Sequence, residues 1–164
     1  MVMLKTTNHE ITFSEIPDEI TLCINISNCC IRCPDCHSKF LWEDVGEELT
    51  ENLVFSLIDK NEGISCICFM GGDSDSAYLA KLLSKVKEKY PKLKTAIYSG
   101  KEYLDKTFNL SDLDFVKIGP YKKELGGLNN PKTNQRFYSL HPTLKDITHK
   151  FWKNDNNTNI INSN

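Results

Sequence analysis

Three cysteines stand close together in this 164-residue chain, at a spacing that suits metal chemistry. Cys29, Cys33 and Cys36 form a C-x3-C-x2-C triplet within residues 28–37. Three thiolates in one short loop can hold three corners of an iron–sulfur cube and leave the fourth iron without a protein ligand. An open iron can bind and reduce a small molecule, which a cluster with four cysteine ligands cannot do. The triplet therefore predicts a catalytic 4Fe–4S cluster.

The segments around the triplet place it in a loop. Positions four and seven residues apart would also share one face of a helix, but Pro34 lacks an amide proton and biases Cys33 away from helical geometry. Residues 19–26 are rich in β-branched and apolar side chains, which predicts a strand. The cysteines then follow the carboxyl end of that strand, where α/β folds place their ligand sites.

Three other interpretations use the same cysteines. A zinc site could combine Cys33 and Cys36 with Cys66 and Cys68. However, residues 64–70 form a continuous apolar run that predicts a buried strand, so the core is the better place for that second pair. A ferredoxin-type C-x2-C-x2-C register would start at Cys30, but no fourth cysteine followed by proline accompanies it. Seven cysteines without a secretory signal argue against a disulfide framework.

Strand and helix patterns alternate after the cysteine loop. Thr50 is a candidate N-cap for a helix with Leu53, Leu57 and Ile58 on its apolar face. The strand at 64–70 follows, and then a helix that ends before Pro91. The apolar positions of this second helix are Tyr78, Leu79, Leu82, Leu83, Val86 and Tyr90. Residues 95–99 and 115–118 predict further strands. This β-α-β-α order predicts an α/β fold with a parallel sheet, and the units are too few for a closed eight-fold barrel.

Residues 1–153 are expected to form a single domain, because no internal repeat or composition shift divides them. The regular pattern fades after Pro120, and residues 126–131 have the composition of a loop, which would cover or border the open barrel edge. Residues 154–164 are rich in asparagine and predict a disordered tail.

Composition excludes some classes of partner. Twenty Lys and Arg against 22 Asp and Glu give a formal charge of −2, which predicts no attraction to nucleic acid or to a membrane surface. Reduced cysteines without a leader segment predict a cytoplasmic location.

The motifs resemble those of one enzyme superfamily. The triplet resembles the cluster motif of the radical S-adenosylmethionine enzymes, and Gly71-Gly72-Asp73 follows the next strand, where that superfamily carries its glycine-rich motif. Residues 114–121, which end in Gly-Pro-Tyr, and residues 133–136, which contain Asn-Gln-Arg, resemble segments of anaerobic ribonucleoside-triphosphate reductase activating proteins. The similarity runs in the same order from about Ile16 to Tyr138.

The resemblance implies a partial, open (β/α) barrel and a specific reaction. S-adenosylmethionine would chelate the open iron, and an electron from the reduced cluster would cleave its sulfonium bond to give a 5′-deoxyadenosyl radical. That radical would remove hydrogen from a glycine of the reductase large subunit. The resemblance also implies a low-potential electron donor of the flavodoxin or ferredoxin type. Alternatives are an activase of another glycyl radical enzyme, such as pyruvate formate-lyase, a small-molecule radical enzyme, or a non-catalytic electron-transfer or zinc-binding module.

The resemblance also implies cofactor contacts beyond the catalytic and metal-binding Cys29, Cys33 and Cys36. The stretch Asp35-Cys36-His37 would lie against the adenine. Asp35 departs from the aromatic residue that many superfamily members carry there, and His37 either stacks on the adenine or is an exposed loop histidine.

Residues that follow the later strands complete the predicted cofactor site. Gly71 and Gly72 would let backbone groups approach the amino group of the cofactor, with Asp73 adding charge. The alternative for this segment is a plain turn in which Asp73 or Ser74 caps the next helix.

Ser99 and Lys117 follow or end two further strands and would face the same cavity. A lysine in an apolar strand needs a buried partner. For Lys117, the candidates are the cofactor carboxylate and an acid such as Asp73, while Ser99 is alternatively a turn residue. No separate roles are assigned to Asn134, Gln135 and Arg136, which would bind the cofactor or the partner protein.

Overall fold

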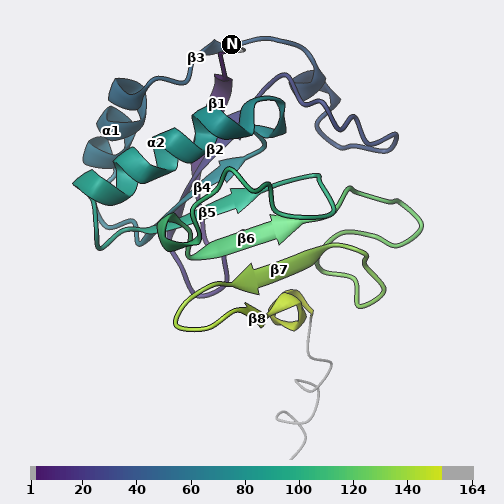
Figure 1. The fold of residues 1–164 in the computed structure, drawn as a ribbon. Coiled ribbons are helices and arrows are strands. Elements are labelled where there is room, and N and C mark those ends of the chain that lie inside the picture. The colour runs from purple at the N-terminus through teal and green to yellow at the C-terminus, as the bar shows by residue number, and fades with distance from the viewer. Residues whose placement is uncertain (1–2, 153–164) are drawn as a thin grey trace, which may run out of the picture.

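The computed structural model describes residues 3–152, so the predicted tail at 154–164 lies outside the described residues. One eight-stranded sheet has the order β3-β1-β2-β4-β5-β6-β7-β8. Figure 1 shows this sheet with helices α1 (Glu51–Lys60) and α2 (Ser76–Lys89) on one of its faces. The strands are β1 (Lys5–Thr12), β2 (Thr21–Ile26), β3 (Glu47–Glu48), β4 (Cys66–Met70), β5 (Lys94–Tyr98), β6 (Phe115–Ile118), β7 (Arg136–Ser139) and β8 (Lys145–Asp146).

The centre of the sheet is parallel, as the alternating pattern predicts. β2, β4, β5 and β6 are neighbours in that order, and each pair is parallel. All four predicted strands are therefore confirmed, with small shifts at their ends. Because parallel strands share a direction, the loops that follow them meet at the same edge of the sheet.

Antiparallel strands at both sides complete a mixed α/β sheet. β1 pairs with β2 and β3 on one side, and β7 pairs with β6 and β8 on the other. The expectation that regular structure fades after Pro120 is therefore wrong for β7 and β8. Both strands are short, with four and two residues, and they pair with segments far away or across a turn, which a local sequence pattern does not reveal.

Two caps fix where the helices begin. Thr50 Oγ1 accepts a hydrogen bond from Leu53 N at 3.1 Å, which confirms the predicted N-cap of α1. For α2 the capping group is Asp75, whose Oδ1 accepts from Tyr78 N at 3.0 Å. The suggestion that Asp73 or Ser74 caps this helix is wrong, and Asp73 has other partners.

The sheet carries a different apolar core on each face. The helix-covered face packs Leu22, Ile24 and Phe69 of the strands against Leu57 of α1 and Leu83 of α2. The other face holds a second apolar core of buried side chains. This second core comprises Ile16, Cys23, Cys66, Cys68, Ala96, Phe115, Phe137 and Ile147. The prediction that Cys66 and Cys68 belong to a buried strand is confirmed.

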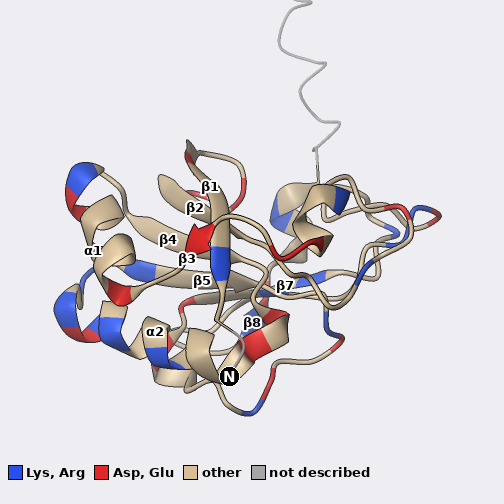
Figure 2. Cartoon of the chain, turned by 90° about the horizontal axis from the view of Figure 1, so that it is seen from above, with Lys and Arg blue, Asp and Glu red and all other residues tan. Residues whose placement is uncertain are grey.

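Charged residues lie mainly on the outside. Lys81 and Lys89 of α2 are exposed, and Figure 2 shows the basic segments of this helix at the periphery. No helix among residues 3–152 is both long and apolar enough to cross a membrane.

Candidate metal centre

The three cysteines of the triplet lie in an irregular loop that follows β2. None of Cys29, Cys33 and Cys36 is in a helix, and each is partly buried. Cys29 N donates to Leu41 O at 2.9 Å, and Cys36 N donates to Cys33 O at 3.0 Å in a tight turn. The backbone of Ser38 donates to Cys36 Sγ at 3.3 Å. Such N–H donors stabilise negative charge on a ligating sulfur.

The donor set fits an iron–sulfur cluster better than a single metal ion. All three cysteines are free thiols at the surface of one loop. Within residues 3–152, no three side chains of His, Cys, Asp or Glu converge closely enough to hold one ion. Cluster ligands need not converge, because each thiolate binds a different iron at a corner of the cube. Three soft sulfur donors in one loop therefore match a cluster with three protein ligands.

The alternative zinc site is wrong, because its second pair of ligands, Cys66 and Cys68, lies in the core. Cys66 and Cys68 have no exposed surface and belong to β4. Cys66 lies opposite Thr21, at the start of β2, whereas the cysteine loop follows the end of that strand. Burial raises the pKa of both thiols, which keeps them protonated and unreactive. Cys30, by contrast, is exposed beside Cys29.

Asp73 joins the turn after β4 to the turn after β5. Its Oδ1 accepts from Ser99 Oγ at 2.6 Å, and its Oδ2 accepts from Gly100 N at 2.9 Å. Ser99 is almost fully buried, and its Oγ accepts from Lys101 N at 3.1 Å. Asp73 and Ser99 are therefore brought together, a contact that the sequence did not predict, and each already has a partner within the protein.

Lys117 is a buried cation without a carboxylate partner. Its Nζ donates to Gly119 O at 2.7 Å and to Ser99 O at 3.2 Å, and the residue is only 9% exposed. The partner that this lysine requires is thus a pair of carbonyl groups, and not Asp73 as one alternative suggests. Burial lowers its pKa to about 8, while the nearby charges of Cys33, Asp73, Cys29 and Cys36 oppose that shift. Lys117 therefore lies within electrostatic reach of all three triplet cysteines.

Both glycines after β4 require the absence of a side chain. Gly71 has φ +105° and Gly72 has φ +98°, a region that residues with a Cβ rarely adopt. A Cβ on Gly72 would also lie 2.7 Å from Leu79 Cδ2. The turn can therefore bring its backbone close to a ligand, as the sequence predicts, although it also serves helix packing.

A cavity of about 960 Å³ opens at this edge of the sheet. Lys117 and Tyr98 line it from β6 and β5, Gln135 lines it from the residue before β7, and His37 lines it from the cysteine loop. The predicted loop at 126–131 forms much of its border. The ring of His37 lies 5.2 Å from that of Tyr121 between centroids, so this exposed histidine already has an aromatic neighbour. Asp35 is exposed and does not line the cavity.

The Gly-Pro-Tyr and Asn-Gln-Arg segments meet at the end of β6. Asn134 Nδ2 donates to Pro120 O at 2.9 Å, and Gln135 Nε2 lies 3.5 Å from Gly119 O. Arg136 pairs with Ile118 at the end of β6, and its side-chain Nη1 lies 3.9 Å from Asp146 Oδ2. Asn134 and Gln135 therefore shape the backbone that holds Lys117, and Gln135 also reaches the cavity.

Some residues that line the cavity have no counterpart among the predicted site residues, Tyr98 and Glu15 among them. Tyr98 and Glu15 line the cavity, and the Tyr98 hydroxyl donates to the carbonyl of Glu15. Tyr98 has a sequence signal, because it lies in the strand predicted at 95–99 and alternation puts it on the same face as Ala96. Glu15 has none, since it precedes β2 in an irregular segment.

Comparison with known proteins identifies the family. The model of the 4Fe-4S single cluster domain matches residues 20–138, which is more than half of the chain. The match includes the cysteine loop and all four parallel strands. No curated protein and no solved structure matches the chain. The loop of free cysteines, which has donors suited to a cluster, agrees with this match. The chain therefore belongs to the 4Fe-4S single cluster domain family.

Proposed function

We propose that this protein is a radical S-adenosylmethionine activase that forms a glycyl radical on an anaerobic ribonucleoside-triphosphate reductase. Three features support the proposal: the cysteine triplet, the glycine turn after β4, and the Gly-Pro-Tyr and Asn-Gln-Arg segments that meet beside Lys117. The matching domain family also occurs in radical S-adenosylmethionine activase-like proteins. When bound, the cluster supplies the electron that cleaves the sulfonium bond of S-adenosylmethionine.

Lys117 is the observation that carries the proposal. Its two carbonyl partners leave one N–H of the ammonium group available, and the cavity lies beside it. A buried cation is stabilised by an anion that enters its cavity. The carboxylate of S-adenosylmethionine is such an anion, and the cysteines whose charges act on Lys117 would place that carboxylate beside the iron.

The other predicted residues would then have distinct tasks. Gly71 and Gly72 would present backbone to the cofactor amino group, with Asp73 fixing the neighbouring turn through Ser99 and Gly100. His37, which lines the cavity beside Tyr121, would flank the adenine, and Asp35 would approach the adenine only through its backbone. The size of the cavity is near the upper end of the ~300–1,000 Å³ typical of small-molecule sites, which leaves room for a substrate segment.

The partners in this proposal are the reductase large subunit and a low-potential donor of the flavodoxin or ferredoxin type. The first test uses anaerobically reconstituted protein with S-adenosylmethionine and dithionite. Formation of 5′-deoxyadenosine is expected, whereas a non-catalytic electron-transfer or zinc-binding module would form none.

The second test adds a candidate partner. With the anaerobic reductase present, electron paramagnetic resonance should show a glycine-centred radical that disappears when the partner's radical glycine is replaced by alanine. Cofactor cleavage with a radical on pyruvate formate-lyase alone would assign the activase to that enzyme instead.

The third test concerns Lys117. Lys117→Ala should weaken S-adenosylmethionine binding by about 1–3 kcal/mol, the range for a charge-assisted hydrogen bond. Iron content should stay unchanged. Lys94→Ala is the matched control, because Lys94 begins β5 at the amino end of the sheet and does not line the cavity. It should leave the affinity for S-adenosylmethionine unchanged. Equal S-adenosylmethionine affinity in the parent protein, Lys117→Ala and Lys94→Ala would make Lys117 a structural residue.

A further inference from the structure

Ile31 is the apolar side chain inside the C-x3-C interval, and it packs against a glycine of another loop. Ile31 lies between Cys29 and Cys33, in the loop after β2. Gly100 lies in the turn after β5. A Cβ built on Gly100 would stand 2.7 Å from Ile31 Cγ1, 3.0 Å from its Cγ2 and 3.1 Å from its Cβ. The position therefore has no room for any side chain while Ile31 keeps its place.

The turn that receives Ile31 is held from three sides. Asp73 fixes it through Gly100 N at 2.9 Å and Ser99 Oγ at 2.6 Å. On the opposite side, Lys101 O accepts from Gly119 N at 2.7 Å. The Lys101 side chain adds bonds to Ser76 Oγ at 3.3 Å and to Asp105 Oδ2 at 3.0 Å. The turn is thus joined to the segments that follow β4 and β6, and it forms a fixed surface.

Two backbone hydrogen bonds to a later part of the same loop hold the start of the segment that carries Ile31. Asn28 N donates to Glu43 O, and Cys29 N donates to Leu41 O, each at 2.9 Å. Asn28 and Arg32, on either side of this stretch, have positive φ values of 58° and 50°. Residues with a Cβ adopt that region only when their surroundings hold them there. The contact of Ile31 with Gly100 supplies such a constraint between the first and second ligand.

A side chain at position 100 could not be accommodated by a simple rotation of Ile31. Isoleucine is branched at Cβ and has few χ1 positions. The Cβ of Ile31 is itself among the atoms too close, so a change of χ1 would not remove every contact. The backbone of residues 30–32 would have to move, and the spacing of Cys29 and Cys33 would change with it.

We propose that Gly100 is a positioning residue for the cluster. Because Gly100 has no side chain, Ile31 can pack against the turn that Asp73 holds. This contact sets the positions of Cys29 and Cys33 relative to the cluster. The proposal rests on the cluster site that the family match indicates, and not on the radical reaction. It can therefore be tested without S-adenosylmethionine.

The experiment compares four variants after anaerobic reconstitution: Gly100→Ala, Ile31→Ala, the Gly100→Ala/Ile31→Ala double variant, and Gly63→Ala. Gly63, before β4, has φ +89° and nothing within 4 Å of a built Cβ. Its replacement strains the backbone far from the cysteine loop and controls for general destabilisation. The measurements are iron and sulfide per chain, the rate of iron loss to a chelator, the electron paramagnetic resonance spectrum of the reduced cluster, and the melting temperature of the apoprotein.

Gly100→Ala should lose iron roughly tenfold faster than the parent protein, the low end of the effect of residues that orient metal ligands. Its reduced cluster should also give an altered resonance spectrum. The double variant should retain iron better than Gly100→Ala alone, since alanine at position 31 removes the two closest atoms. Gly63→Ala should lower the melting temperature without changing iron loss or the spectrum.

Three outcomes would overturn the proposal. Gly100→Ala could keep the parent rate of iron loss and the parent spectrum. It could behave like Gly63→Ala, with a lower melting temperature and an unchanged cluster. The double variant could lose iron as fast as Gly100→Ala, which would show that Ile31 does not transmit the effect.

Discussion

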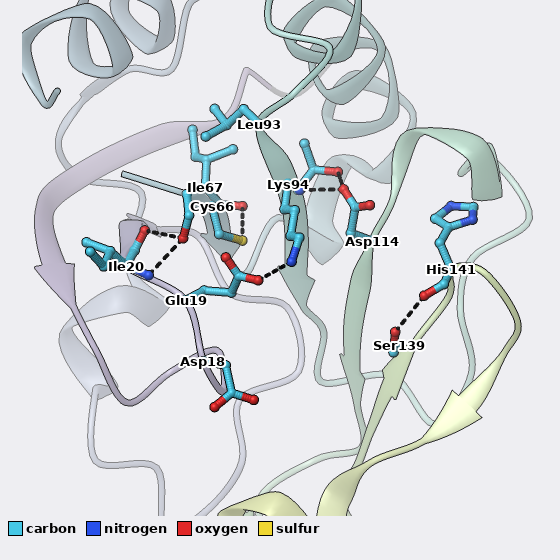
Figure 3. A network of polar contacts seen from close by, with 12 residues as sticks. Asp18, Glu19, Ile20, Cys66, Ile67, Leu93, Lys94, Asp114, Ser139 and His141 are labelled. Atoms are coloured by element: carbon cyan, nitrogen blue, oxygen red, sulfur yellow. Dashed lines mark hydrogen bonds and ion pairs between the residues drawn. The ribbon is translucent and has the colours of Figure 1, made fainter. Parts of the chain in front are cut away.

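The two ends of the four parallel strands differ in how their charged side chains are paired. At the amino end, Glu19 forms an ion pair with Lys94, as Figure 3 shows. There too, Asp114 Oδ2 accepts from Lys87 Nζ at 2.6 Å and from Thr95 N at 2.9 Å. At the carboxyl end, Lys117 has two carbonyl groups and no carboxylate of its own. Each acid in the amino-end network has a cationic partner, whereas the buried cation at the carboxyl end has only carbonyl partners among the described residues.

The cysteines divide in the same way. Cys29, Cys33 and Cys36 are partly exposed in the loop at the carboxyl end, whereas Cys23, Cys66 and Cys68 are buried in the strands. Burial raises the pKa of Cys66 and Cys68, while a hydrogen bond from Cys68 lowers that of Cys23. The same residue type thus packs the core in one region and supplies the candidate cluster ligands in the other. Position relative to the sheet edge distinguishes the two roles.

The largest effect should come from replacing the loop cysteines. Cys29→Ala, Cys33→Ala and Cys36→Ala should each abolish the 4Fe–4S absorption and all cleavage of S-adenosylmethionine, because each removes one corner ligand. The measurement is iron and sulfide per chain with the visible spectrum after anaerobic reconstitution.

Cys30→Ala is the matched control for this set, since Cys30 is exposed in the same loop. It should keep the cluster. A protein that loses the cluster with Cys30→Ala and keeps it with Cys29→Ala would have the ferredoxin-like register, and the proposed radical chemistry would lose its main support.

The next largest effect is the pH dependence of stability that arises from Lys117, at the carboxyl end of the parallel strands, and from Lys94, at their amino end. The folded apoprotein holds the pKa of Lys117 at about 8, against 10.5 for a free lysine, because the side chain is buried. As the pH falls from about 10.5 to about 8, the unfolded chain takes up this proton before the folded one does, so folding loses stability across that window. The full penalty is about 3 kcal/mol and is constant below it.

Lys117→Met should remove this loss, and the comparison is urea unfolding of apoprotein between pH 7.5 and about 10.5. Lys94 should behave in the opposite sense. The hydrogen bond with Glu19 raises the pKa of Lys94, so its contribution is present at neutral pH and is lost as the pH rises above the usual lysine range. The same slope in Lys117→Met and the parent protein would contradict an unpaired buried cation at this end.

The amino-acid sequence predicts the parallel half of the fold well, because that half depends on local patterns. Runs such as residues 64–70 and 115–118 are mostly apolar, and Thr50 and Pro91 mark helix ends. β1 has no such signal: seven of its eight residues are polar, and residues 8–11 are all exposed. It is a strand because it pairs with β2, and that pairing depends on contacts distant in sequence.

The site was predictable in its residue types but not in its connections. The cysteine spacing and the placement of Ser99 and Lys117 after neighbouring strands are visible in one dimension. The bonds from Asp73 to Ser99 and Gly100 are not, because they join separate loops. The packing of Ile31 against Gly100 could not be predicted either, because these residues also belong to separate loops. A glycine in a loop predicts a turn, and only the fold shows which side chain fills the space that a Cβ would occupy.

The smallest effect should come from the strand cysteines. Cys68→Ala removes one buried sulfur from the second core and should lower the free energy of unfolding by on the order of 1 kcal/mol, a small cavity cost. Cys68→Ser should cost more, because a buried hydroxyl replaces a thiol whose neighbours are Met70 Sδ at 3.5 Å and apolar side chains. Urea unfolding of the apoproteins measures both. Each variant should reconstitute with the parent content of iron and sulfide, since Cys68 lies within β4 and the cluster ligands lie in the loop beyond β2. Loss of iron from either variant, at full folding, would show that the strand cysteines take part in metal binding and that the division between the two regions does not hold.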